Sequence, residues 1–367
     1  MKRVYFLSLI ALLSFPIGAE IALSGGKAQT RSGVAQPTPT PSVRPAPTIR
    51  EEDVVEKVET ELVNLNVRVV DRNNRPISNL RQSEFKIYED NVLQQIDFFS
   101  VSEVPTNYSL VIDNSGSLRQ QIDQVIEASK ILIAANKPED ETSIIRFVSS
   151  DKIEVVEDFT KNKADLVDAL ESKLYIEGGQ TAIIDAVYLA AQQITKYEEQ
   201  KNSVDRKRRA LILISDGEDR TSFYTQQQLF ELLRESDVQI YVVGFVKDLS
   251  AEKGFITKSP QGKAKAFLER LASETGGKAY FPNSISELNG IARDIASELR
   301  TQYSIGYLPT NDRKDGTYRN IKVVINDGPN NQKRIALTRA GRTAEVEGGS
   351  PTTGPTLQKP GQASKNP

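Results

Sequence analysis

The sequence predicts an α/β protein in which a doubly wound, mostly parallel sheet is inserted into a small β-sandwich. Apolar strand-like runs alternate with amphipathic helix-like segments across residues 106–300. This alternation is typical of a parallel sheet covered by helices on both faces. The two flanks, residues 55–103 and 302–341, carry strand-like patterns only. Because three or so strands are too few to cover a core, we expect the flanks to join into one sandwich.

Residues 1–19 predict an export signal. Lys2 and Arg3 precede an apolar stretch from Val4 to Phe15, and we expect cleavage after Ala19. The alternative, an uncleaved membrane anchor, is disfavoured because this stretch is shorter than the roughly 20 apolar residues of a spanning helix. We therefore expect a periplasmic or secreted protein with no stable membrane span after cleavage.

Two further segments predict disorder. Residues 20–54 and residues 342–367 are rich in Gly, Pro, Ser and Thr. Such sequences bury too little apolar surface to offset the entropy lost on ordering. We expect an extended linker before the first strand and a disordered tail after the last one.

Composition excludes several kinds of chemistry. The chain has no His and no Cys, which excludes thiolate or imidazole zinc sites, Ser-His-Asp catalysis and disulfides. A metal ion would have to be held by oxygen atoms. The formal net charge is -2, so nothing in the charge balance indicates a nucleic-acid partner. We interpret the basic run Arg206–Arg209 as a solvated approach to the next strand rather than a patch for an anionic partner.

The flanks contain six strand-like segments. Residues 63–69 alternate apolar and polar side chains, which indicates a half-buried strand. Turn-like sequences at Asp71–Pro76 and Glu89–Asn91 separate the first three segments. The remaining predicted strands are Phe85–Tyr88, Gln95–Phe98, Tyr303–Tyr307, Asn320–Ile325 and Arg334–Leu337.

The middle region predicts five strands and six helices. The strands expected in a mainly parallel sheet are Ser109–Ile112, Thr142–Val148, Ala210–Ile214 and Gln239–Phe245. Residues 153–159 suit a short antiparallel edge strand. The amphipathic helices are Leu118–Ala135, Lys163–Leu170, Ala182–Tyr197, Thr225–Glu235, Lys265–Thr275 and Ser286–Thr301.

The most informative motif follows the first strand of the middle region. Asp113, Ser115 and Ser117 form a D-x-S-x-S pattern where the apolar run ends. Ligands bind at the carboxyl ends of strands in open α/β sheets, and clustered hard oxygen donors suit Mg²⁺. The alternative is that these polar residues cap the next helix, and the motif alone does not decide between the two.

Two more oxygen donors occur at matching positions. Thr181 follows Gly178-Gly179 just before a predicted helix, and Asp216 follows the strand Ala210–Ile214. Individually, Thr181 suits a helix cap and Asp216 a turn. All five residues together, in register with the predicted strand ends, favour one metal site at the carboxyl edge of the sheet.

The middle region resembles a von Willebrand factor type A (VWA) domain, a Rossmann-like fold. The resemblance covers about residues 106–300, and the oxygen donors match the D-x-S-x-S…T…D pattern of its metal-ion-dependent adhesion site. The residues that carry the match are Asp113, Ser115, Ser117, Thr181 and Asp216. Ile240–Phe245 and Leu271–Tyr280 look like bacterial members of the family. The flanks, with Phe85–Asp90 and Glu298–Tyr307, look like exported VWA-related acidobacterial proteins.

The resemblance implies a division of labour among the five residues. Ser115 and Ser117 would bind the metal directly, and Thr181 and Asp216 would alternate between direct and water-mediated contact. Asp113 would act through water or by orienting the serines. Mg²⁺ is the expected ion, with Mn²⁺ or Ca²⁺ as alternatives, and a carboxylate from a protein or peptide partner would complete its coordination.

We therefore expect a non-enzymatic, exported adhesion protein. The first alternative is a hydrolase that uses the same cation as a Lewis acid, with Asp185, Glu218 or Asp219 as general base. Asp185 is otherwise expected to be an outer-shell residue of the metal site or an exposed helix acid. The second alternative is a structural component of an envelope assembly whose metal site is vestigial.

Overall fold

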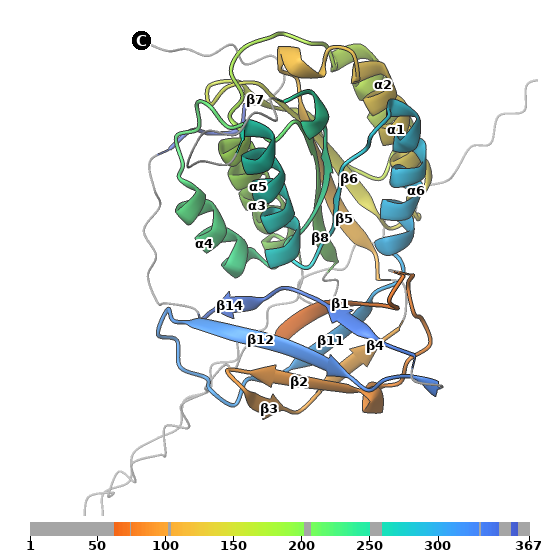
Figure 1. Ribbon diagram of the computed structural model, residues 1–367. Coiled ribbons are helices and arrows are strands. Elements are labelled where there is room, and N and C mark those ends of the chain that lie inside the picture. Colours follow the sequence, from red (N-terminus) through yellow and green to blue (C-terminus); the bar gives the residue numbers. More distant parts are fainter. Residues whose placement is uncertain are drawn as a thin grey trace, which may run out of the picture. The chain divides into compact units, whose positions relative to one another are not determined.

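The computed structural model describes residues 62–344, apart from residue 74 and the segments 102–103, 202–206, 250–258 and 330–331, and then residues 354–358. The predicted export signal and linker lie outside these residues. Everything described belongs to one compact unit, which contains an α/β domain and a β-sandwich (Figure 1). No helix in this described part is long and apolar enough to cross a bilayer.

The α/β domain is built on a six-stranded sheet in the order β10-β9-β8-β5-β6-β7. Neighbouring strands are parallel except for the edge strand β7, which is antiparallel to β6. The strands are β5 (Thr106–Asp113), β6 (Glu141–Phe147), β7 (Ile153–Thr160), β8 (Arg208–Ser215), β9 (Gln239–Gly244) and β10 (Ala279–Tyr280). The prediction of a mostly parallel sheet is confirmed, and only β10, too short to leave a periodic pattern, was not foreseen.

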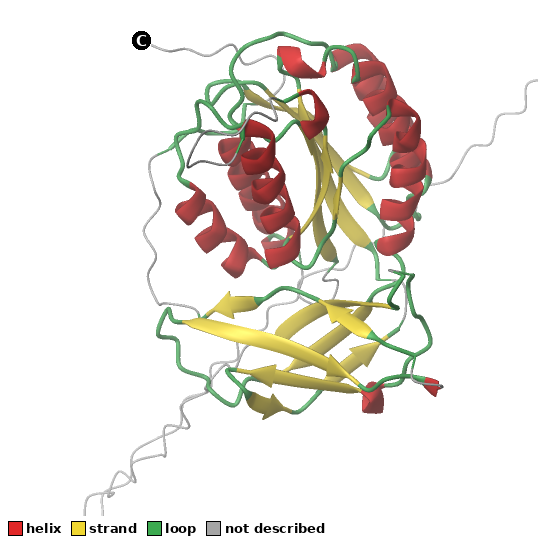
Figure 2. Cartoon of the chain, in the orientation of Figure 1, coloured by secondary structure: helices red, strands yellow, loops and turns green. Residues whose placement is uncertain are grey.

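Helices cover both faces of this sheet (Figure 2). They are α1 (Ile122–Ala134), α2 (Lys163–Lys173), α3 (Ile183–Glu199), α4 (Gln226–Ser236), α5 (Pro260–Glu274) and α6 (Leu288–Glu298). One apolar core lies under α1, α2 and α6, and a second lies under α3, α4 and α5. The doubly wound arrangement follows from these two cores, because β5, β6, β8 and β9 each contribute buried apolar side chains to both of them.

Helix boundaries differ most from the prediction at α1 and α5. A 3-10 turn over Gly116–Leu118 precedes α1, so the helix starts at Ile122 rather than Leu118. Helix α5 starts at Pro260, whose fixed φ suits a first helical position, and the Ser259 hydroxyl caps it by accepting a hydrogen bond from the Gly262 N–H.

The flanks form the predicted sandwich of two antiparallel sheets. Their orders are β13-β1-β11-β4 and β14-β12-β2-β3, so both sheets combine strands from the two ends of the chain. The strands are β1 (Val63–Val70), β2 (Phe85–Glu89), β3 (Val92–Gln94), β4 (Phe98–Ser100), β11 (Tyr303–Tyr307), β12 (Tyr318–Ile325), β13 (Ile335–Leu337) and β14 (Gly341–Thr343). Their inward side chains make one core, which includes Leu65, Val67, Ile87, Tyr303 and Ile305.

Two predictions about the first flank have opposite outcomes. The predicted turn at Glu89–Asn91 is confirmed: Asp90 and Asn91 both have positive φ, 48° and 67°, as a two-residue hairpin turn requires. The predicted strand Gln95–Phe98 is wrong, since residues 95–97 connect β3 to β4. The Asp97 carboxylate there accepts a hydrogen bond from the Leu308 N–H at 2.8 Å, which ties this connecting segment to the residue after β11.

The C-terminal end also differs from the expected disordered tail. Strand β14 extends to Thr343 by pairing with β12, and residues 354–358 lie along β7, where Gln358 forms a bridge with Glu154. The rest of the tail lies outside the described residues. One backbone bridge to the edge strand β7 and the packing of Leu357 against the core hold this segment despite its polar composition.

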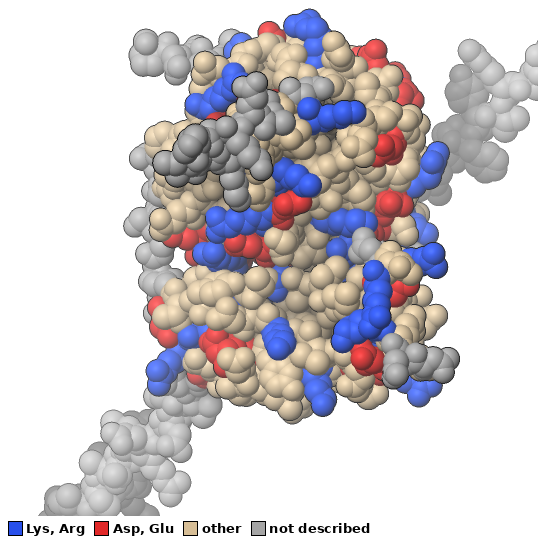
Figure 3. Space-filling model, viewed as in Figure 1, with Lys and Arg blue, Asp and Glu red and all other residues tan. Residues whose placement is uncertain are grey.

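Charged side chains join the sandwich to the α/β domain. Arg68 of β1 pairs with Glu298 at the end of α6, and Lys278 reaches the same carboxylate at 2.9 Å. Arg208, predicted to lie on a solvated approach, is instead buried at the start of β8 and donates to the carbonyl oxygens of Leu299 and Gln302 at 3.0 and 2.9 Å. On the face shown in Figure 3, basic and acidic side chains are interspersed.

Removal of the Glu298 carboxylate is expected to destabilise the protein strongly. Arg68 is only 3% exposed, and a buried charge that loses its partner costs about 3–5 kcal/mol. Urea unfolding of Glu298→Ala measures this loss. The control is Glu269→Ala, because Glu269 and Lys265 form an ion pair with both side chains about half exposed, worth below about 1 kcal/mol. Equal losses in the two variants would contradict the assignment of Glu298 as a buried anchor.

Candidate metal centre

The Asp113 carboxylate is the centre of the candidate site. It lies at the carboxyl end of β5 and is fully buried. One oxygen, Oδ1, accepts a hydrogen bond from the Ser115 N–H at 2.8 Å, and Oδ2 accepts one from the Ser215 hydroxyl at 2.6 Å. Because Ser215 ends the neighbouring strand β8, this carboxylate joins the ends of two adjacent strands.

The two serines of the motif face each other and cap no helix. The Ser115 and Ser117 hydroxyl oxygens are 2.8 Å apart. Ser115 precedes the 3-10 turn without a side-chain capping bond, and Gln121, which precedes α1, makes none either. Helix capping therefore does not explain these hydroxyls, which leaves them available to a ligand.

Asp216 lies in the turn directly after β8. It is buried, and its Oδ1 accepts a hydrogen bond from the Glu218 N–H at 3.0 Å. The prediction that Asp216 is a turn residue is therefore confirmed. Gly217 has φ +81°, and a Cβ there would meet the Leu268 side chain at 2.7 Å. Only glycine fits this turn, which holds Asp216 at the edge of the sheet next to Ser215.

Thr181 is buried and is held by its backbone rather than by helix capping. Ala182, not Thr181, is the N-cap of α3. The Thr181 carbonyl accepts hydrogen bonds from the N–H groups of Arg220 and Thr221 at 2.8 and 3.3 Å. Its position is therefore fixed by the same loop that carries Asp216, and its hydroxyl has no hydrogen-bond partner among the described residues.

The glycines before Thr181 allow this segment to approach the motif loop. Gly179 has φ +121°, and a Cβ there would meet the Val148 side chain at 2.7 Å. The Cα of Gly178 lies 3.8 Å from the position of a Cβ on Gly116. Tight packing of these three loops places the hydroxyl and carboxylate donors at one edge of the sheet.

Asp185 holds together the loop after β6 and the loop after β8. This side chain is fully buried, so it is not an exposed helix acid. Its two oxygens accept hydrogen bonds from the N–H groups of Phe223 and Tyr224, both at 2.8 Å, and from the Ser150 hydroxyl. Asp219 adds a cap to α3 by accepting from the Ile184 N–H at 3.1 Å.

The electrostatics of the site favour a bound cation. Burial raises the pKa of Asp113 to about 6, and the negative charge of Asp216 adds to the rise, while hydrogen bonds from Ser215 and Ser115 oppose it. Among the described residues, Arg220 is near enough for the charge of Asp216 to raise its pKa, but its ion pair is with Glu218. Two buried carboxylates and three hydroxyls fit a hard divalent ion.

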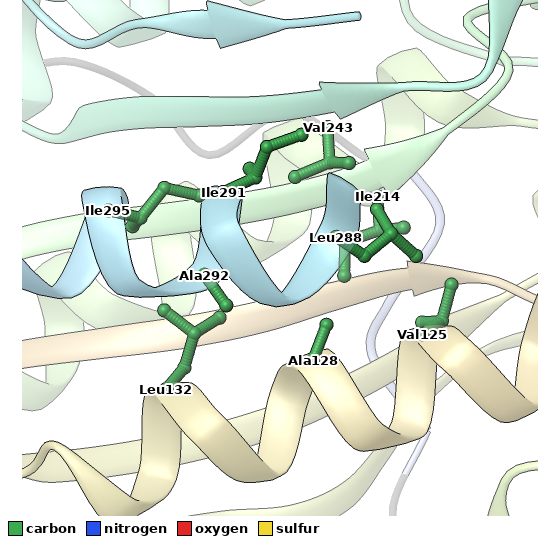
Figure 4. Close-up of a pocket in the computed structure, with 9 residues that line it drawn as sticks. All are labelled: Val125, Ala128, Leu132, Ile214, Val243, Leu288, Ile291, Ala292 and Ile295. Atoms are coloured by element: carbon green, nitrogen blue, oxygen red, sulfur yellow. The ribbon is translucent and has the colours of Figure 1, made fainter. Parts of the chain in front are cut away.

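This donor set is rich in hydroxyls rather than in acids. No group of three or more Asp, Glu, His or Cys side chains gathers as a metal site within the described ranges. A small pocket between α1, α6 and the sheet is lined by apolar side chains only (Figure 4). It offers no polar atom for a ligand, so the edge at Asp113 is the candidate functional site.

The domain is doubly wound and carries a D-x-S-x-S motif, a Thr and an Asp at the carboxyl edge of its sheet. These features define the class of domains that have a metal-ion-dependent adhesion site. The family model of the von Willebrand factor type A domain matches residues 109–294, which is half of the chain. The chain therefore belongs to this family. A comparison with curated proteins gave no match. The resemblance of the flanks to the acidobacterial group stays a prediction.

Several solved structures are similar to the chain at low identity. An aerotolerance-related membrane protein from Bacteroides fragilis is 19% identical, with coverage of 53% of this chain and 98% of that chain and a TM-score of 0.40. Mussel byssus proximal thread matrix protein 1, described with a zinc-occupied MIDAS motif, is 18% identical over 54% of this chain and 48% of that one, with a TM-score of 0.42. A von Willebrand factor type A protein from Catenulispora acidiphila is 12% identical over 78% and 73%, with a TM-score of 0.44.

Sequence reasoning missed the residues that support the site. Ser215, which bonds Asp113, and Ser150, which bonds Asp185, were not assigned roles. Ser215 could have been found, because it immediately precedes Asp216 at a strand end. Ser150 could not, since its contact joins segments that are distant in the sequence.

Asp113→Asn is expected to stabilise the metal-free protein at pH 7.5. An asparagine can keep both contacts: its Oδ1 accepts from the Ser115 N–H, and its Nδ2 donates to the Ser215 oxygen, which reverses the direction of that bond. The shift of the Asp113 pKa from 3.8 to about 6 means that its ionised form opposes folding at neutral pH, by on the order of 3 kcal/mol. We expect the Tm to rise by roughly 5 °C.

The pH dependence provides the check. The raised pKa lets the folded protein hold the Asp113 proton, so the penalty is complete above about pH 6 and absent below the unfolded pKa. The Tm difference between variant and native protein should shrink as the pH falls from 7 to 5. The exposed Asp294 supplies the control, Asp294→Asn, whose Tm should stay near the native value. A lower Tm for Asp113→Asn would refute the prediction.

Proposed function

We propose that this chain is an exported, non-enzymatic binding protein that captures a carboxylate of a protein partner through a divalent cation. Family membership supports a metal-dependent interaction role in general terms. The cation, Mg²⁺ with Mn²⁺ or Ca²⁺ as alternatives, would be held by Asp113, Ser115, Ser117, Thr181 and Asp216. Bound there, it supplies an electrophilic position for one oxygen of the partner.

One observation carries the proposal. The Ser115 and Ser117 hydroxyls point at each other, 2.8 Å apart, beside the buried Asp113 and cap no helix. Neutral hydroxyls in contact with a cation leave more of its charge uncompensated than carboxylates do. An acidic group from outside the chain is then the natural partner.

An exposed aromatic residue on the same loop supports a protein partner. Phe223 lies beyond Asp216 and is 60% exposed, although its backbone N–H is held by Asp185. Aromatic side chains are enriched at protein interfaces. We expect Phe223 to contribute an apolar contact to the partner's surface.

The three acids considered as general bases are engaged elsewhere, which supports a binding role over hydrolysis. Asp185 accepts two backbone N–H groups, Asp219 caps α3, and Glu218 pairs with Arg220. A base must reach the proton that it removes, and these carboxylates are committed to the loops. Turnover of peptide or phosphoester libraries that is abolished by Asp113→Ala would instead favour the hydrolase.

Titration with Mg²⁺ and Mn²⁺ by calorimetry tests the metal site. The Ser115→Ala/Ser117→Ala variant is expected to lose at least about tenfold in metal affinity. Ser284 and Ser286 provide a matched control, because their hydroxyls lie 2.9 Å apart at the same i,i+2 spacing in the segment after β10, which carries none of the five donors. The Ser284→Ala/Ser286→Ala variant should bind metal as the native protein does.

Binding that survives unchanged in the Ser115/Ser117 variant would disprove the site. At a hundredfold excess over Kd, metal should also add about 2.7 kcal/mol to the free energy of unfolding. If no divalent ion raises the Tm, the structural role in an envelope assembly becomes the better account.

Metal-dependent capture from an envelope extract tests the interaction. The native protein should retain a partner in Mg²⁺ and release it in EDTA, whereas Asp113→Ala should retain none. Phe223→Ala should capture less while its metal affinity stays native. Leu308→Ala, an exposed apolar residue on the sandwich, should behave as native. Equal capture by native protein and Asp113→Ala would refute the proposal.

Export has a separate test. Sequencing of the N-terminus of the mature protein should show that it begins at Glu20.

A further inference from the structure

A short C-terminal segment forms a single parallel β-bridge with the edge of the central sheet, between Gln358 and Glu154. β7 is an edge strand of that sheet, and residues 354–358 lie beside it. The Val155 N–H donates to the Gln358 carbonyl, and the Gln358 N–H donates to the Ile153 carbonyl, both at 2.9 Å. An edge strand presents unpaired backbone groups that can template pairing with another chain, and here the tail pairs with those of Ile153 and Val155.

The side chains of this segment face different ways. Leu357 packs against the apolar core under α3, α4 and α5, whereas Thr356 is exposed. The Gln358 side chain donates to the Asp151 carbonyl. Backbone pairing with one anchoring side chain is the way in which sheet edges bind extended peptides.

The segment also touches the loop that carries the candidate metal site. A Cβ on Gly354 would lie 2.1 Å from the Tyr224 hydroxyl oxygen, so the two groups are in close contact and only glycine fits. Tyr224 is buried, its ring stacks on Tyr188 with centroids 3.8 Å apart, and its N–H donates to Asp185 at 2.8 Å. The tail therefore braces the turn that Asp185 holds.

We propose that the edge of β7 is an acceptor site for an extended peptide with one apolar anchor, and that residues 354–358 are its exchangeable occupant in this chain. Two backbone hydrogen bonds and one leucine make a weak contact in trans. Within one chain, effective concentrations of about millimolar keep it closed. A partner peptide of the same pattern would displace the tail and free the Tyr224 turn. This site needs no metal and stands apart from the proposed function.

Peptide binding to a chain cut after folding tests the acceptor site. A protease site replaces residues 347–350 of the full chain, and the released tail is removed by gel filtration. The probe is a fluorescein-labelled peptide of residues 352–361. Anisotropy titration should show binding to the cut chain at least tenfold tighter than to the uncut chain. Equal binding to both, or no binding to the cut chain, would overturn the proposal.

Two peptide variants separate the anchor from general charge effects. Leu357→Asp should abolish binding to the cut chain, because it would place a carboxylate in the apolar core. Thr356→Asp adds the same charge at an exposed position and should bind as the native peptide does. Equal effects of both changes would contradict the assigned orientation.

Hydrogen exchange of the full-length chain tests the brace. In the Leu357→Asp chain the amides of Val155 and Tyr224 should exchange about tenfold faster than in native protein, while Thr356→Asp leaves them unchanged. The Val155 amide reports the strand pairing, and the Tyr224 amide reports the turn at Asp185. Unchanged exchange at both amides in the Leu357→Asp chain would show that the tail does not cover this edge.

Discussion

A buried carboxylate at the end of a central strand organises the functional edge of this protein. Asp113 receives a backbone N–H from its own loop and a hydroxyl from the end of β8. These bonds align the two loops that carry the remaining donors. They do not neutralise the charge, and the negative Asp216 close by raises the cost of keeping Asp113 ionised. The ionised form of Asp113 is therefore disfavoured in this environment, and a cation held beside it would favour that form.

The rest of the fold holds that unfavourable arrangement in place. Asp185 and Asp219 bind the backbone of one loop to the start of α3. Gly179 and Gly217 allow backbone to approach side chains where any Cβ would collide. The donors are thus fixed before a ligand arrives, and such preorganisation lowers the entropy lost on binding.

Sequence patterns predicted what depends on local periodicity and missed what depends on distant contacts. The alternation in β1 and the apolar runs of β5 and β8 were visible because each strand carries its own signal. The D-x-S-x-S loop was recognised, but whether its serines cap a helix could be decided only from geometry. The burial of Arg208 and the pairing of residues 354–358 with β7 were not predictable, because their partners lie far away in the sequence.

The insertion of one domain into the other has a consequence for the order of folding. Val63 pairs with Tyr307 and Ile325 with Phe85, so each sandwich sheet needs strands from both ends of the chain. Closing such long loops before any contact forms is entropically costly and slow. Folding of the α/β domain first brings Thr106 and the end of α6 to the same side and shortens the effective loop. Until then β1 exposes an apolar face, so a nascent chain is most vulnerable to aggregation before its last strands are released.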